Sequence, residues 1–123
     1  DFVGGMLKYM RRYPIERLTV GGGFAKMVKL AQGNLDLHSA RSQVDFKQLA
    51  QWLSDLDAKP DDVARAAQAN TAAQVLMSAG NIEIGDLVAR RAREVALATL
   101  SGRTAVEIVI VDRNGTVVGR ADG

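Results

Sequence analysis

The stretch that decides the fold is Arg17-Leu18-Thr19-Val20-Gly21-Gly22-Gly23-Phe24-Ala25-Lys26-Met27-Val28-Lys29-Leu30-Ala31-Gln32-Gly33. Its first part, Arg17–Val20, predicts a short strand, and Gly21–Gly23 predicts a tight turn after it. Phe24–Gln32 has the apolar spacing of a helix, with Gly33 as its C-terminal cap. A strand, a glycine-rich turn and a helix in succession are typical of an α/β layer with parallel strands.

The segment before this stretch predicts another helix, Phe2–Tyr13, which ends at Pro14. Its apolar side chains recur at helical spacing and form a face for the core: Phe2, Met6, Met10 and Tyr13. A helix ahead of the first strand implies a preceding strand outside the sequence. We therefore expect the chain to be a fragment of a larger protein.

Four more helices are predicted after an irregular, polar segment at residues 34–44. Asp45 caps the first of them, with Gln48 placed as in a capping box. Its apolar stripe consists of Phe46, Leu49, Ala50, Leu53 and Leu56, with Trp52 beside it. The other three are predicted at Pro60–Ala69, Thr71–Ala79 and Ile84–Leu100.

The end of the chain predicts a β-hairpin. Ala105–Val111 is almost continuously apolar, as in a strand buried on both faces. Asn114-Gly115 is a strong turn signal, and Thr116–Val118 is the predicted return strand. We expect one α/β domain over residues 1–123, in which helices flank a sheet with parallel strands, including 17–20 and 105–111, and a C-terminal hairpin.

Composition excludes several classes of function. The chain has 123 residues, 47% of them hydrophobic, and a net charge of +2, so it can form one core without a strongly basic surface for nucleic acid. It has no cysteine and one histidine, which excludes disulfides and zinc sites made of thiolates or several histidines. No apolar run is long enough for a membrane helix. We expect no protein-bound metal, no membrane partner and a cytoplasmic location.

The glycine turn is the strongest candidate site. Glycines allow a ligand close to the backbone, and free N–H groups at the start of a helix attract anions. Lys26 is not followed by Ser or Thr, so this is not a P-loop. A tight structural turn without a ligand remains the alternative.

Three further candidates lie in the polar segment after the helix. His38 can transfer protons near neutral pH, Ser39 is beside it, and Arg41 can bind a carboxylate with two hydrogen bonds. A hydrogen-bonding histidine and a solvated arginine are the alternatives. Other charges have structural interpretations: Arg90, Arg91 and Arg93 form a solvated face with local ion pairs such as Asp86–Arg90, and the methionine and aromatic stripes are core.

The run from Val20 to Gly33, with Asp36-Leu37-His38-Ser39 after it, resembles the cobalt-precorrin-5B C1-methyltransferase family, the CbiD family. The pattern Lys-x-x-Lys-Leu-Ala-x-Gly and the His-Ser pair carry the resemblance, and Asp1-Phe2-Val3-Gly4 adds to it. Ala25 differs from the glycine that the family commonly has there. The resemblance covers most of this chain and matches the C-terminal part of a full-length member.

The resemblance implies methyl transfer from S-adenosylmethionine to ring carbon C1 of cobalt-precorrin-5B, giving cobalt-precorrin-6A in cobalamin biosynthesis. Residues that could bind the tetrapyrrole substrate or the methyl donor are Gly21, Gly22, Gly23, Lys26, Lys29, Ser39 and Arg41, with His38 as the catalytic candidate. We expect the full-length protein to be the enzyme and residues 1–123 alone to be inactive. The alternatives are a non-catalytic scaffold or oligomerisation domain, including a homo-oligomer, and a generic anion-binding module built on the glycine turn.

Overall fold

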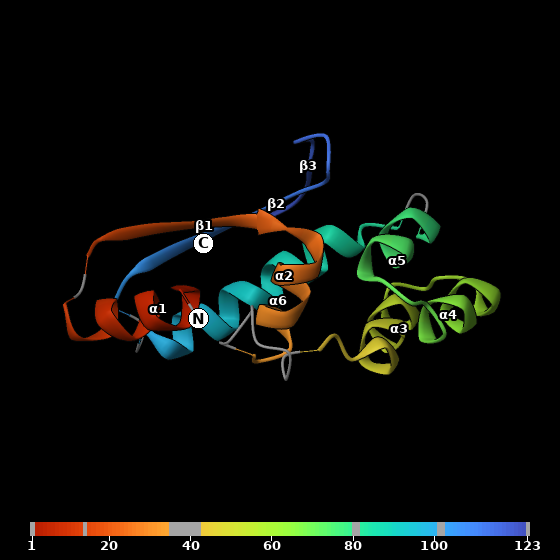
Figure 1. Ribbon diagram of the computed structural model, residues 1–123, viewed down its shortest axis with the longest axis horizontal. Helices are drawn as coiled ribbons and strands as arrows, with labels where there is room; N and C mark the ends of the chain where they lie inside the picture. Colours follow the sequence, from red (N-terminus) through yellow and green to blue (C-terminus); the bar gives the residue numbers. More distant parts are fainter. Residues whose placement is uncertain (1, 14, 35–42, 80–81, 101–102, 123) are drawn as a thin grey trace.

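The computed structural model describes residues 2–13, 15–34, 43–79, 82–100 and 103–122 (Figure 1). Within these ranges the side chains of residues 2–4 are not described. The elements are α1 (Phe2–Arg12), β1 (Arg17–Gly23), α2 (Phe24–Ala31), α3 (Phe46–Asp55), α4 (Pro60–Ala67), α5 (Ala72–Ser78), α6 (Ile84–Thr99), β2 (Ala105–Val111) and β3 (Val117–Ala121).

The three strands form one sheet in the order β1-β2-β3. β1 runs parallel to β2, with a register from Arg17↔Ala105 to Gly23↔Val111. β3 returns antiparallel to β2. The predicted fold class, with parallel strands in one sheet and a C-terminal hairpin, is confirmed.

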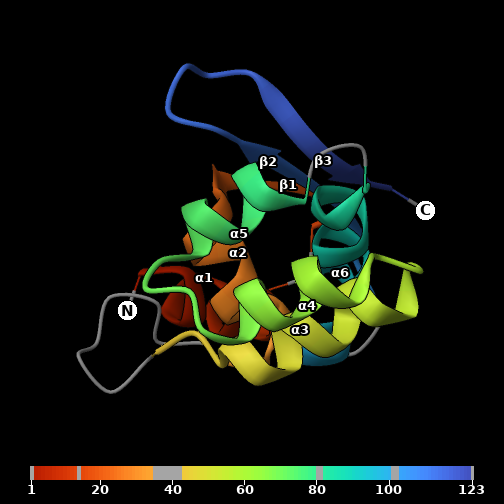
Figure 2. The ribbon, with the colours of Figure 1, turned by 90° about the vertical axis from the view of Figure 1, so that its right-hand side faces the viewer.

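The helices lie on one side of the sheet, as both views of the ribbon show (Figures 1 and 2). The long helix α6 is central and packs against α2, β2 and β3. Side chains of the covered face, such as Val20, Ile108 and Ile110, are buried. The opposite side chains of β2, Glu107, Val109 and Val111, are only partly buried. The prediction that this strand is buried on both faces is wrong, because an apolar run does not reveal how many layers cover it.

The glycine segment also differs from its prediction. Gly21, Gly22 and Gly23 continue β1 and pair with Val109, Ile110 and Val111. None of the three has a positive φ, and the backbone at Gly23 is extended, with φ −72° and ψ 162°. The strand therefore enters α2 without an intervening turn. Pairing with β2 outweighs the weak intrinsic preference of glycine for strands.

The predicted helices are all present, and their ends move by a few residues. α1 reaches the core through Leu7, which is fully buried, whereas Tyr13 is 55% exposed and stacks on the exposed ring of Tyr9 at 4.8 Å between centroids. Met77 on α5 is exposed as well. The assignment of the methionine and aromatic stripes to the core is therefore wrong at these residues and right at Met27 and Trp52.

The predicted cap of α3 is half confirmed. The Asp45 carboxylate accepts a hydrogen bond from the Gln48 N–H at 3.1 Å. In a capping box the Gln48 side chain would accept from the Asp45 N–H, but here Gln32 takes that role. The Gln32 side-chain amide accepts from the Asp45 N–H and donates to the Asp45 carbonyl, both at 2.8 Å. Gln32 thus joins the end of α2 to the start of α3.

The hairpin contains Asn114-Gly115 as predicted, with a longer turn. The Asp112 carboxylate accepts from the N–H groups of Asn114 and Thr116 at 2.8 and 3.0 Å, and Gly115 takes a φ of +80°. A register shift between Ile110 and Val111 adds to the irregularity. As a result β3 begins at Val117 and not at Thr116.

α6 approaches β3 more closely than side chains would permit. A Cβ built on Gly85 would lie 2.7 Å from the Val118 carbonyl carbon and nearer still to its oxygen. A Cβ on Gly119 would lie 2.9 Å from the Gly85 Cα. The Asp86 carboxylate accepts from the Arg120 N–H at 3.0 Å beside this contact. Glycine at both positions is required by the packing.

Candidate functional site at the end of the parallel strands

The carboxyl end of β1 carries the residues predicted to bind a ligand. Gly23 is the N-cap of α2, and no side chain among the described residues caps the helix. The first turn of α2 contains the exposed Lys26 and no acidic residue. Free N–H groups at a helix start and a nearby cation both favour an anion. Ligands of α/β sheets usually bind outside the carboxyl ends of the strands, where this helix begins.

The three glycines differ in what surrounds them. Gly22 faces the core, and a Cβ there would lie 3.0 Å from the terminal methyl carbon of Met27. Gly21 and Gly23 face the uncovered side of the sheet. A Cβ on Gly21 would have only ordinary contact with the Val109 carbonyl at 3.9 Å, and one on Gly23 would have no neighbour within 4 Å. Packing within the described residues does not require glycine at either position.

The other predicted site residues are placed in part. Lys26 lies in the same first turn of α2, three residues after Gly23, so the structure brings these two together. Lys29 follows one turn later and is half-buried. His38, Ser39 and Arg41 lie outside the described residues.

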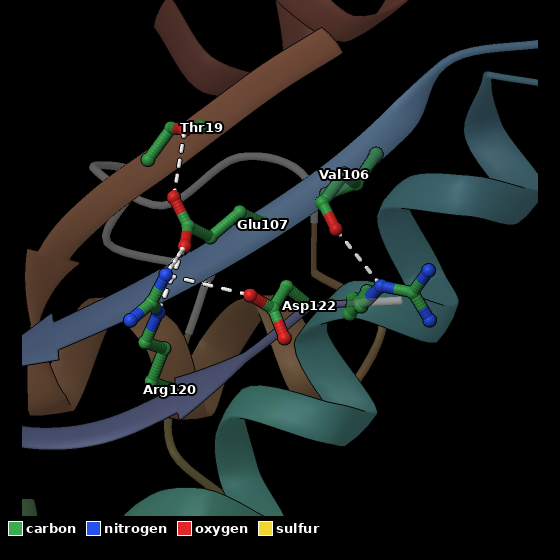
Figure 3. Close-up of polar contacts among 6 residues, drawn as sticks. Thr19, Val106, Glu107, Arg120 and Asp122 are labelled. Atoms are coloured by element: carbon green, nitrogen blue, oxygen red, sulfur yellow. Dashed lines mark hydrogen bonds and ion pairs between the residues drawn. The ribbon is translucent and has the colours of Figure 1, made fainter.

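A polar cluster on the uncovered face was missed by the sequence analysis (Figure 3). The Thr19 hydroxyl donates to the Glu107 carboxylate at 3.0 Å, and the Arg120 Nε donates to the same carboxylate at 2.8 Å. A second guanidinium nitrogen of Arg120 also bonds to Glu107 and lies 3.4 Å from the Asp122 carboxylate. The cluster therefore links all three strands and the segment after β3.

The cluster favours the charged forms of Glu107 and Arg120. The hydrogen bond from Arg120 lowers the pKa of Glu107, and the hydrogen bond from Thr19 lowers it further. The same bond to Glu107 raises the pKa of Arg120. These side chains border a depression of about 780 Å³ at the amino ends of β1 and β2. Because Glu107 is held ionised by partners within the chain, we assign the cluster to joining the strands.

One signal in the sequence could have located this cluster. Glu107 is the only charged residue in the apolar strand Ala105–Val111, and a charge there needs a partner. Choosing Arg120 as that partner requires the hairpin register, which the irregular turn shifts. The partner could therefore not be deduced from spacing alone.

Arg90 and Arg91 of α6 are exposed as predicted, but Arg93 and Asp86 bond to the sheet and not to neighbours on the helix. The Arg93 Nε donates to the Val106 carbonyl at 2.8 Å, in a partly buried bond to the sheet. The Arg91 guanidinium lies 5.4 Å from the centre of the buried Trp52 ring. Asp86, expected to pair with Arg90, bonds to the backbone of β3. Tertiary partners outweigh i,i+4 pairing here, which contributes only a few tenths of a kcal/mol.

The described ranges contain neither a metal-ligand cluster nor a membrane-spanning helix. No group of three or more His, Cys, Asp or Glu side chains in them could hold a metal ion. No helix in those ranges is both long and apolar enough to span a membrane.

Comparison with known proteins decides the family. The family described as "CbiD, C-terminal domain" matches residues 36–122. The chain belongs to the CbiD family. The resemblance noted from the glycine and lysine run is thereby confirmed, although residues 21–29 precede the matched CbiD domain.

Curated CbiD relatives cover this run too. The chain is 52% identical over 122 residues to a protein of Paramagnetospirillum magneticum named cobalt-precorrin-5B C(1)-methyltransferase, covering 98% of this chain and 34% of that protein. Proteins of the same name from Bradyrhizobium sp. and Brucella ovis are 49% and 51% identical, covering 100% and 98% of this chain. The chain thus spans about a third of the length of these relatives. No solved structure matches it.

Proposed function

We propose that this chain is the C-terminal part of a cytoplasmic enzyme that methylates C1 of cobalt-precorrin-5B with S-adenosylmethionine, giving cobalt-precorrin-6A. One observation carries the proposal. Relatives that align with 98% or more of the chain, at 49–52% identity, bear the methyltransferase name. The substrate is a cobalt-bound tetrapyrrole, so its metal ion arrives with it.

The reaction is a displacement. The nucleophilic ring carbon forms a bond to the methyl carbon, and the carbon–sulfur bond breaks, so that the sulfonium sulfur keeps the electron pair and leaves as a thioether. Both reactants carry carboxylates, and the protein's main contribution is to hold them in line. Binding residues near the reacting atoms therefore matter more than a nucleophile of the enzyme.

The carboxyl end of β1 fits a carboxylate of either reactant. The start of α2, which no described side chain caps, provides N–H donors, and Lys26 provides a cation in the first turn. Lys29, Ser39 and Arg41 are further candidates for the same carboxylates, and His38 is the candidate for moving a proton.

The test is methyl transfer from labelled S-adenosylmethionine to cobalt-precorrin-5B in the full-length protein. We expect Lys26→Ala to lower kcat/KM about tenfold or more, since a hydrogen bond to a charged group contributes about 1.5–3 kcal/mol. The melting temperature should stay unchanged because Lys26 is exposed. Lys47→Ala removes another exposed lysine, on α3, and is the matched control. Equal losses in both variants would contradict the assignment of Lys26.

His38→Ala follows the same design. We expect lower turnover with an unchanged melting temperature. Normal specific activity combined with a lower melting temperature would show that His38 has a structural role.

Ligand titration separates this proposal from its alternatives. An enzyme of this class should bind S-adenosylmethionine or its demethylated product in the full-length protein, whereas a scaffold should bind neither. A generic anion module should bind inorganic phosphate as well as either of them. Residues 1–123 alone should show no turnover, because a tetrapyrrole is large and pockets occur preferentially at domain interfaces.

A further inference from the structure

β1 is an edge strand whose outer side has no strand partner among the described residues. The Glu16 carbonyl accepts from the Ala105 N–H at 2.9 Å, so the backbone groups of Glu16 point toward β2. Backbone groups alternate sides along a strand. The N–H and carbonyl groups of Thr19 and Gly21 therefore point toward the free edge.

This edge lacks the features that keep exposed edges from pairing. Charged side chains, prolines and bulges are the usual ones, and β1 has none of them from Leu18 to Gly23. The opposite edge differs, because β3 carries Arg120, pairs through an irregular register and is covered by α6 at Gly85. Within the part of the chain that the structure describes, only β1 offers a regular row of free backbone donors and acceptors.

The sheet face opposite the helices, which borders this edge, is not covered by any described element. Gly21 and Gly23 point outward with space for a Cβ, and Val109 and Val111 next to them are partly buried. Glycine inside a strand costs stability, and one reason for it is another backbone that approaches closely. Within the described residues no such backbone approaches, so the reason for these glycines lies outside them.

We propose that β1 is an interior strand in the longer proteins of this family. An extended segment from the two thirds of the relatives that this chain does not match pairs with the free edge, and the layer that carries it covers Gly21, Gly23, Val109 and Val111. The relatives supply the occupant, since the matched segment is only 34% of the Paramagnetospirillum magneticum protein. A segment of the same polypeptide has a high effective concentration and so outcompetes a second copy of the chain.

Hydrogen exchange tests this without any mutation. The Thr19 and Gly21 amides should exchange rapidly in this chain, and the aligned amides of the unmodified Paramagnetospirillum magneticum protein should exchange at least about a hundredfold more slowly. The Leu18 and Val20 amides, which point toward β2, are the internal control and should be protected in both proteins. Rapid exchange at the aligned positions of the longer protein would overturn the proposal.

Other occupants give distinct results. Protection of Thr19 and Gly21 in this chain that rises with protein concentration would mean a second copy, and would overturn the proposal. Protection on adding S-adenosylhomocysteine alone would mean a ligand, with the same consequence. Neither readout measures methyl transfer, so the result stands whether or not the proposed activity is found.

Paired variants test the edge donor itself. Thr19→Pro removes the N–H that points outward, and Thr19→Val removes the hydroxyl bonded to Glu107 while keeping that N–H. In this chain the two variants should melt within about 2 °C of each other. In a chimera with this chain in place of the matching third of the relative, Thr19→Pro should melt clearly lower than Thr19→Val. Equal melting temperatures in the chimera would contradict the proposed pairing.

Discussion

Two pairs of glycines in this chain have opposite surroundings. Gly85 and Gly119 bring the backbones of α6 and β3 into direct contact, and a Cβ on either would overlap the other element. Gly21 and Gly23 lie on an open strand face where a Cβ has room. Packing inside the chain explains the first pair and does not explain the second. When packing within the described residues does not require a glycine, its presence indicates that a group from outside those residues approaches the backbone there.

The strongest way to break the internal contact is Gly119→Ala. The added methyl would force α6 away from β3, so we expect a loss of about 3 kcal/mol in unfolding free energy, at the upper end for overpacking. Urea denaturation measures it. Gly5→Ala on α1, where a Cβ meets nothing within 4 Å, is the control and should add about 0.5–1 kcal/mol. A loss below about 1 kcal/mol would mean that α6 and β3 separate easily.

A smaller loss is expected from the hydrogen bond beside that contact. Asp86→Ala leaves the Arg120 N–H without its acceptor and should cost about 1–2 kcal/mol. Asp86→Asn keeps an oxygen acceptor there and should retain part of this stability. If the two variants unfold at the same urea concentration, the carboxylate does not contribute to the junction of α6 and β3.

The polar cluster on the open face should appear in the acid dependence of stability. The folded pKa of Glu107 is lowered, chiefly by its hydrogen bond with Arg120, so the carboxylate stabilises the fold above its unfolded pKa of about 4.3. This contribution is lost as the pH falls from there through the lowered folded pKa. Glu107→Gln should therefore make the acid loss of stability shallower, as followed by melting at several pH values. Glu94→Gln on the exposed side of α6 is the control for losing one carboxylate.

The smallest change in stability is expected for the glycines on the open strand face, Gly21 and Gly23. Gly21→Ala should leave the stability of this chain unchanged or raise it by up to about 1 kcal/mol, because alanine loses less backbone freedom and has space here. The measurement is the melting temperature of Gly21→Ala, compared with that of Gly119→Ala under the same conditions. A loss of more than about 1 kcal/mol would mean that the face at Gly21 is already occupied within the chain.

The sequence predicted the order of elements, one sheet that contains 17–20 and 105–111, the hairpin and the cap at Asp45, because these depend on local apolar spacing and turn residues. Prediction from the sequence failed where contacts with residues far along the chain determine the local structure or the bonding partner. Three consecutive glycines predicted a turn, and only pairing with Val109–Val111 makes them strand. The pattern of the helix alone predicted Arg93 and Asp86 as surface charges, but both bond to backbone groups of the sheet.

The candidate site was predictable only in part for the same reason. Lys26 and the start of α2 follow from the local pattern of a strand and a helix. The cluster of Thr19, Glu107 and Arg120 depends on the register of three strands and on a turn longer than its signal. One-sided burial of the sheet depends on the number of layers, which no single stretch of sequence encodes.

The Gln32 amide has a consequence for evolution and engineering. By binding both backbone groups of Asp45, it holds together the two points where residues 33–44 leave and rejoin the helices. Added length between fixed ends costs little, because each doubling of a flexible loop adds only about 0.6 kcal/mol of closure entropy. The end of α2 and the start of α3 can therefore keep their positions when the length of chain between Gln32 and Asp45 changes.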